Sequence, residues 1–186
     1  MHTAYIGMGG NLASWAGAPE ATLAAAALRL ESLGRVARRS SLYSTAPVGF
    51  AEQPRFVNAV VELETELGPR ELLEGLLAIE KEFGRDRAEG IKNGPRTLDL
   101  DILLLDDLQI CEQIGEMGLE IPHLHLAERA FVLVPLCEIA AQVQVPGHGK
   151  SVGQLMDSQV SKSRLGAHAG SKGESDAVVR VQSTSW

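Results

Sequence analysis

The spacing of hydrophobic positions changes along the chain between a period of two residues, typical of strands, and a period of three to four, typical of helices. Residues 56–65, with the sequence FVNAVVELET, show the strand pattern. Residues 69–83 show the helical pattern, because Leu72, Leu76 and Ile79 fall on one side. The elements expected in the first part of the chain are a strand at 3–7, a helix at 19–33, strands at 36–44 and 56–65, a helix at 69–83 and a strand at 98–105.

The order strand, helix, strand, strand, helix, strand predicts an α+β fold, a ferredoxin-like βαββαβ sandwich. Its helices pack on one face of an antiparallel sheet, and the site lies on the other face. A small hairpin at 109–121 and a further helix at 126–140, kinked or ended by Pro135, are expected as additions. We expect residues 1–158 to form one domain and residues 159–186, rich in Ser and Gly, to form a disordered or loosely docked tail.

The charge of the chain limits the partners that it can bind. The net charge is −7 and the pI is near 5.2, which argues against nucleic acid or an anionic membrane, because both are usually bound by basic surfaces. No apolar run approaches the ~20 residues of a membrane span, and the first residues lack a signal pattern, so we expect a cytoplasmic protein. Two cysteines, Cys111 and Cys137, are expected to be reduced thiols.

The sequence KNGPRTLDLDIL at residues 92–103 carries the clearest candidate chemistry. Side chains two apart on a strand point the same way, so Asp99 and Asp101 would project from one face, about 7 Å apart. Two carboxylates beside a polyanionic substrate suit one or two Mg²⁺ ions. Taken alone, the pair fits equally well a solvated strand with two unconnected acids.

Basic residues close to this pair favour a phosphate site. Arginine forks bind phosphate oxygens bidentately, and positioned cations stabilise the charge that develops in phosphoryl transfer. The basic residues are Arg85, Arg87, Lys92 and Arg96.

The early string GMGGNL lacks the third spaced glycine of a dinucleotide-binding loop. It is therefore expected to be a flexible loop after the first strand that acts as a lid.

Four other residues have both a functional and a structural interpretation. His123 could reach the same region or be structural, and His125 at H-x-H spacing lacks further ligands for a transition metal. Phe56 and Phe131 are candidates for stacking on a flat heterocycle, because aromatic residues make up only 4% of the chain. Each of these phenylalanines also fits a position in the hydrophobic core.

Four segments in this order resemble the 6-hydroxymethyl-7,8-dihydropterin pyrophosphokinase family, over roughly residues 3–158: AYIGMGGNL, TAPVGFAEQPRFVNAVVELET, KNGPRTLDLDIL and IPHLHLAERAFVLVPL. The resemblance implies a monomeric enzyme of ferredoxin-like fold that acts in folate biosynthesis. Such an enzyme transfers the β,γ-diphosphate of MgATP to the pterin hydroxymethyl group and releases AMP.

The resemblance also implies a role for each candidate residue. Asp99 and Asp101 would bind two Mg²⁺ ions. The catalytic phosphate-side cations, on a mobile loop, would be Arg85, Arg87, Lys92 and Arg96. The residues that bind ATP would be Glu80, Ile102, His123 and Arg129. The residues that bind the pterin would be Thr45, Val48, Phe56, Asn58 and Phe131, with the two phenylalanines sandwiching the ring.

Several positions depart from the commoner pattern of the family. Phe56 stands where tyrosine is often found, Asn93 where a tryptophan is often found, and Lys92 where arginine is usual. Leu124 and Ala127 replace polar or basic side chains near ATP. These changes affect how the loop closes and how tightly ATP binds, more than the chemistry itself.

Two rival functions fit the residues before the resemblance is considered. One is a non-enzymatic ferredoxin-like module that senses a small ligand, because a fold alone does not fix a function. The other is a different metal-dependent phosphotransferase or phosphohydrolase that uses the same two carboxylates. Formation of AMP that depends on a pterin separates all three possibilities.

Overall fold

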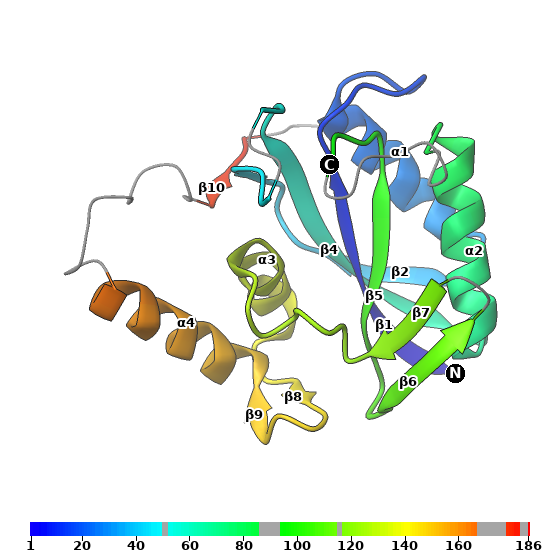
Figure 1. Cartoon of the computed structure of the whole chain (residues 1–186). Helices are drawn as coiled ribbons and strands as arrows, with labels where there is room; N and C mark the ends of the chain where they lie inside the picture. The colour runs from blue at the N-terminus through cyan, green and yellow to red at the C-terminus, as the bar shows by residue number, and fades with distance from the viewer. Residues whose placement is uncertain (50–51, 86–93, 115–116, 167–177, 183–185) are drawn as a thin grey trace.

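The computed structural model describes residues 1–49, 52–85, 94–114, 117–166, 178–182 and 186. A central sheet is covered on one face by α1 and α2, and α3 packs on the other face with α4 beside it (Figure 1). The elements in chain order are β1 (His2–Gly10), α1 (Pro19–Leu30), β2 (Arg35–Arg39), β3 (Tyr43–Thr45), β4 (Phe56–Thr65), α2 (Pro69–Glu82), β5 (Asp99–Leu105), β6 (Ile110–Ile114), β7 (Met117–Ile121), α3 (Ala130–Ala140), β8 (Gln144–Val145), β9 (Lys150–Ser151), α4 (Val152–Gly166) and β10 (Val179–Arg180).

The strands of the main sheet run in the order β10-β3-β4-β1-β5, with antiparallel pairing throughout. Strand β2 pairs with β4 next to β3, so the single strand expected at 36–44 is divided into two short strands along one edge. The paired order of β5, β1, β4 and this divided strand is that of a ferredoxin-like sheet, which confirms the predicted fold.

The main hydrophobic core lies between the sheet and the pair α1 and α2. Leu23 of α1 and Leu76 of α2 are fully buried there, against Ile6, Val61 and Leu100 of the sheet. Because side chains alternate along a strand, the neighbours of these sheet residues face the opposite layer. The strand predicted from the period-two pattern of residues 56–65 is thus confirmed, and its residues Val57, Ala59, Val61 and Leu63 share the face that packs on the helices.

A second core lies on the other face of the sheet, under α3. Leu133 and Leu136 of α3 are buried there with Tyr5 and Val60. Helix α3 begins at Ala130, later than the expected residue 126, and continues through Pro135. Since α3 covers only part of this face, the ends of β1, β4 and β5 near residues 9, 58 and 99 are left for a site.

The expected flexible lid at residues 9–11 is wrong, because β1 continues through Gly9 and Gly10. A Cβ atom on Gly10 would lie 2.3 Å from the backbone oxygen of Thr97, and one on Gly9 would lie 2.7 Å from Oδ1 of Asn58. These glycines therefore permit close packing of neighbouring segments rather than motion.

Helix α4 passes through residue 158, where the sequence predicted the end of the domain. Residues 179–180 pair with β3, and Trp186 packs against the main core. The domain boundary predicted at residue 158 therefore does not coincide with the end of an element, and the assignment of residues 159–186 to a tail stays a prediction.

Among the described helices, none has the length and apolar character needed to span a membrane.

Candidate active site

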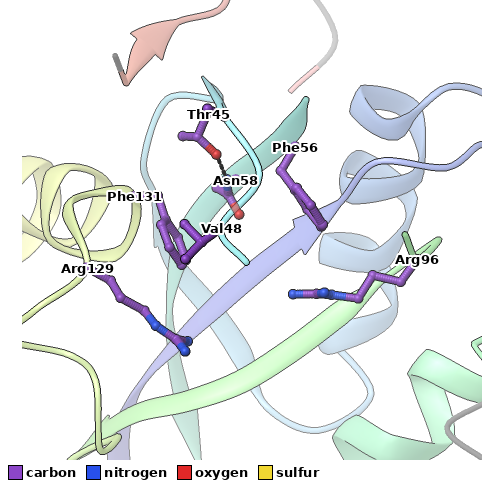
Figure 2. A pocket seen from close by; sticks show the side chains of 8 residues that line it. Thr45, Val48, Phe56, Asn58, Arg96, Arg129 and Phe131 are labelled. Carbon is purple, nitrogen blue, oxygen red and sulfur yellow. Dashed lines mark hydrogen bonds between the residues drawn. The ribbon is translucent and has the colours of Figure 1, made fainter. Parts of the chain in front are cut away.

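A pocket of about 70 Å³ opens where β3, β4 and the start of α3 meet. Figure 2 shows Phe56 and Phe131 on opposite sides of it, with Val48 and Asn58 between them. The structure thus brings together all five residues that the resemblance assigned to the pterin. The residues that line the pocket are Thr45, Ala46, Val48, Phe56, Asn58, Arg96, Arg129 and Phe131.

Strand pairing explains why the polar residues of this pocket meet. Phe56 and Asn58 are two apart on β4 and therefore lie on the same face. Thr45 is paired with Phe56 in the ladder between β3 and β4. The Nδ2 atom of Asn58 donates a buried hydrogen bond to Oγ1 of Thr45 at 2.7 Å. This bond fixes the amide, which keeps further donor and acceptor capacity.

The two aspartates of β5 line a narrow cavity of about 40 Å³ that adjoins the aromatic pocket. Gly9 and Gly7 of β1 are paired with Asp99 and Asp101, respectively. Both glycines line the same cavity, and a side chain at Gly9 would clash with Asn58. Leu100 between them is buried in the opposite core, as the alternation predicted.

Asp99 is held by two arginines from different segments. Its carboxylate lies 3.2 Å from Nη2 of Arg85 and 2.8 Å from Nη2 of Arg96. Of the four basic residues expected at the phosphates, these two are thus gathered at the carboxylate. Arg87, Lys92 and the departure Asn93 lie outside the described residues.

Arg96 connects the carboxylates to the aromatic pocket. Its guanidinium carbon lies 4.7 Å from the ring centroid of Phe56, while that of Arg129 lies 5.6 Å from the ring of Phe131. In Figure 2 both guanidinium groups extend inward from opposite sides. Nε of Arg96 and Oγ1 of Thr97 are buried without a hydrogen-bond partner within the described part of the chain. Arg96 lines both the aromatic pocket and the narrow cavity, where a polar ligand would supply a partner for its Nε atom.

A third cavity, of about 260 Å³, lies on the other side of Asp101. Asp101 lines both this cavity and the narrow one, so the two are neighbours. Ile102 and His123, two of the residues expected to bind ATP, line the third cavity together with Leu124. The other lining residues are Leu73, Leu100, Gly118, Leu119, Glu120 and His125.

His123 is neutral at physiological pH and has a defined tautomer. Burial and the nearby charges of Arg129 and His125 lower its pKa from 6.5 to about 4, although Asp99 acts in the opposite direction. Nδ1 of His123 lies 3.2 Å from the backbone nitrogen of His125, which donates a hydrogen bond to it. The ring proton is therefore on Nε2, which makes His123 an uncharged donor.

The lowered pKa of His123 predicts a dependence of stability on pH. The unfolded chain takes up a proton near pH 6.5 but the folded chain only near pH 4, so the folded state loses stability as the pH falls through this window. The free energy of unfolding should fall by about 2 kcal/mol between roughly pH 7 and pH 5 from this group. Urea unfolding at both pH values measures the loss, and His123→Asn should lack that part of it. An equal loss in both proteins would contradict the prediction.

Glu80 differs from the other residues expected to bind ATP, because its side chain is turned into the protein. It is 1% exposed, and its carboxylate accepts a 2.7 Å hydrogen bond from the backbone nitrogen of Leu100. This bond ties α2 to β5 beside Asp99. The structure therefore gives Glu80 a contact that ties α2 to the strand, while its role in binding ATP stays a prediction.

Asn11 supports the site through the backbone of Arg96, a role that the sequence did not predict. Its Oδ1 accepts a 2.8 Å hydrogen bond from the backbone nitrogen of Arg96, and its Nδ2 donates to Oε1 of Gln53 and to the oxygen of Pro54, both at 3.0 Å. It thus joins the end of β1 to two other loops. Its position after two glycines was visible in the sequence, but its partners are distant along the chain.

Comparison with known proteins identifies the family of this chain. The family model described as 7,8-dihydro-6-hydroxymethylpterin-pyrophosphokinase matches residues 5–141. A 2-amino-4-hydroxy-6-hydroxymethyldihydropteridine pyrophosphokinase of Pseudomonas aeruginosa is 43% identical over 155 residues, which cover 82% of this chain and 88% of the relative. The enzyme of the same name from Bacillus subtilis is 44% identical over 143 residues, covering 76% and 80%.

Solved structures support the same fold. The wild-type Plasmodium falciparum HPPK-DHPS structure matches with a TM-score of 0.71 at 16% identity, covering 97% of this chain. The present chain spans about half of that longer protein, 49% of its length. At this identity the similarity concerns the fold alone. The family model and the curated relatives together show that the chain belongs to the 7,8-dihydro-6-hydroxymethylpterin-pyrophosphokinase family.

Proposed function

We propose that this protein transfers the β,γ-diphosphate of ATP to the hydroxymethyl group of 6-hydroxymethyl-7,8-dihydropterin, giving AMP and the pterin diphosphate, in folate biosynthesis. The observation that carries the proposal is the row of three adjoining cavities. An aromatic pocket is followed by a pair of carboxylates among arginines and then by a larger cavity. This arrangement fits a flat acceptor, a diphosphate in transfer and a nucleotide, in that order.

The aromatic pocket supports recognition of the pterin. Phe56 and Phe131 stand on its opposite sides, which suits stacking on both faces of a flat ring. Asn58 and Thr45 offer hydrogen-bonding groups at the edge of the same pocket, which an apolar pocket could not provide. Binding between these groups would place the hydroxymethyl group toward the carboxylates.

Asp99 and Asp101 form a donor set suited to Mg²⁺. Their oxygen atoms are hard ligands, and Mg²⁺ is commonly held by one or two carboxylates together with substrate phosphates and water. Within the residues that the structure describes, no group of three or more His, Cys, Asp or Glu residues is placed to hold a metal. When bound, Mg²⁺ neutralises phosphate charge and orients the reacting groups. We propose that two ions bind to this pair.

The cations around the carboxylates would hold the phosphates. Arg85 and Arg96 converge on Asp99, and Arg129 reaches inward from the other side. His123 would donate a hydrogen bond from Nε2 without adding charge. We propose the same phosphate-binding role for Arg87 and Lys92. Because Arg96 contacts both Asp99 and Phe56, its position links the phosphate region to the pterin pocket.

We further propose that the enzyme acts as a monomer in the cytoplasm. Light scattering coupled to size-exclusion chromatography, with and without ATP, tests the monomeric state.

A steady-state assay tests the proposed function directly. The purified protein is incubated with ATP, Mg²⁺ and 6-hydroxymethyl-7,8-dihydropterin, and AMP is measured with and without EDTA. We expect AMP that depends on the pterin and is lost on chelation. Production of ADP or phosphate without the pterin would indicate another phosphotransfer reaction. No turnover by the folded protein would favour a ligand-sensing module.

Phe131→Ala should weaken pterin binding by roughly 30-fold, because it removes one stacking face of the pocket. The affinity for ATP should change by no more than about twofold, since the third cavity does not include Phe131. Isothermal titration with each ligand separately measures both effects. Phe131→Tyr keeps the ring and serves as the control. Equal weakening of pterin binding and ATP binding would refute stacking of the pterin between Phe56 and Phe131.

A further inference from the structure

Residues 178–182 and Trp186, here called the strap, cover the outer edge of β3. Val179 and Arg180 form β10, which pairs antiparallel with Ser44 and Tyr43. The backbone nitrogen of Val181 donates a 2.8 Å hydrogen bond to the oxygen of Leu42. In Figure 1 β10, in red, lies beside the short cyan strand β3. The strap thus supplies the neighbour that an edge strand lacks.

Side chains of the strap strengthen this attachment. The indole Nε1 of Trp186 donates a hydrogen bond to the backbone oxygen of Ser40, and the guanidinium of Arg39 lies 5.8 Å from the centroid of its ring. Trp186 and Val181 both pack against the main core. The strap is therefore held by apolar contacts as well as by backbone pairing.

The inner edge of β3 forms part of the aromatic pocket. Tyr43 is paired with Asn58, and Thr45 is paired with Phe56, so the other side of this strand supports three residues that line the pocket. Strand β3 has only three residues. A strand so short is stable only when its neighbours hold it, because it can make few hydrogen bonds of its own.

Glu138 extends the connection to the opposite wall of the pocket. It lies on α3, the helix that carries Phe131. Its carboxylate accepts hydrogen bonds from the backbone nitrogen and the hydroxyl of Ser41, at 2.8 and 2.7 Å, and from the hydroxyl of Tyr43 at 3.0 Å. Arg180 of the strap lies 3.8 Å from the same carboxylate. Burial acts to raise the pKa of Glu138, but these contacts lower it, so the group is held as a carboxylate.

We propose that the strap is a positioning element for the pterin: it holds β3 and its residue Thr45, and through the hydrogen bond from Asn58 of β4 to Thr45 it keeps both in the geometry that closes the aromatic pocket between Phe56 and Phe131. This inference rests on the proposed function, because it assigns the pocket to the pterin. The third cavity is built on β5, β7 and the segment around His123, none of which pairs with the strap. Loss of the strap is therefore expected to weaken binding of the pterin and to leave the affinity for ATP unchanged.

The substitution Val181→Pro removes the one backbone donor of Val181 while the chain keeps its full length. We expect the Kd for 6-hydroxymethyl-7,8-dihydropterin to rise on the order of tenfold, while the Kd for MgATP changes less than about twofold. The matched control is Val181→Ala, which retains the backbone nitrogen and its bond to Leu42. Each Kd is measured by equilibrium titration without turnover, and circular dichroism confirms that each variant is folded.

A second experiment adds the strap back from outside. A chain that ends at residue 177 should bind the pterin as weakly as Val181→Pro, and the synthetic peptide VVRVQSTSW should restore its affinity. The peptide VVRPQSTSW should not. An unchanged pterin Kd in Val181→Pro and in the shortened chain, or an equal weakening of both ligands, would overturn the inference. If the unaltered chain itself bound no pterin, the proposed function would fail instead.

Discussion

Replacement of Asp101 by alanine is expected to lower kcat for diphosphate transfer roughly 10³-fold, because the site would lose one of its two carboxylates. Asp101 lines both the narrow cavity and the larger one, so its charge lies at the junction between them. On the same face of β5, Asp99 is already paired with Arg85 and Arg96, and Leu103 is buried under α3, so neither replaces the lost carboxylate. The measurement is the rate of AMP formation at saturating ATP and pterin.

The fold should survive this change because Asp101 is not part of either hydrophobic core. Asp107→Ala is the matched control: Asp107 is an exposed aspartate in the turn that follows β5, and its removal should leave kcat within about twofold. Thermal unfolding of both variants separates lost chemistry from lost structure. Activity of Asp101→Ala within about tenfold of the unaltered protein would rule out the metal assignment.

Gly10→Ala is expected to lower the free energy of unfolding by about 3 kcal/mol, although it adds only one methyl group. The new Cβ would lie 2.3 Å from the backbone oxygen of Thr97, and backbone atoms cannot move aside as a flexible side chain can. The end of β1 would have to separate from the segment at 96–97. Urea unfolding at pH 7 measures the loss.

The same substitution should also impair the site, because the segment it displaces carries Arg96. The backbone nitrogens of Asn11 and Leu12 both donate to the oxygen of Arg96, at 2.9 and 3.1 Å. Displacement would therefore move the guanidinium away from Asp99 and Phe56. Gly118→Ala, in β7, is the stability control, since the nearest atom to its Cβ would be 4.0 Å away. If Gly10→Ala were no less stable than this control, close packing would not explain the glycine.

Local patterns determined a large part of the fold. The alternation of apolar residues at 56–65 and the helical spacing at 69–83 are properties of neighbouring positions, and each element formed where such a pattern was clear. The placement of Asp99 and Asp101 on one face of β5 follows from the same periodicity, since both line the narrow cavity while Leu100 is buried. The assignment of Phe56 and Phe131 to one pocket depended on resemblance, because these residues are far apart in the sequence.

Predictions failed where the decisive contact joined distant segments. Gly9 and Gly10 were expected to make a mobile loop, because glycine is flexible when considered alone. Their actual neighbours, Asn58 and Thr97, leave no room for a side chain. The start of α3 at Ala130 and the division of the edge strand into β2 and β3 were also not predicted.

The sequence by itself determined the order of the elements, the layer into which most strand residues point and the residues that are proposed to carry the chemistry. Only the tertiary structure decided that Asn11 ties the end of β1 to Arg96, that Glu80 is buried against β5 and that the strap extends the sheet beside β3. The lowered pKa of His123 was likewise decided only by the tertiary structure. The reason is physical: periodicity depends on the nearest residues along the chain, whereas burial, charge and close packing depend on residues that folding brings together.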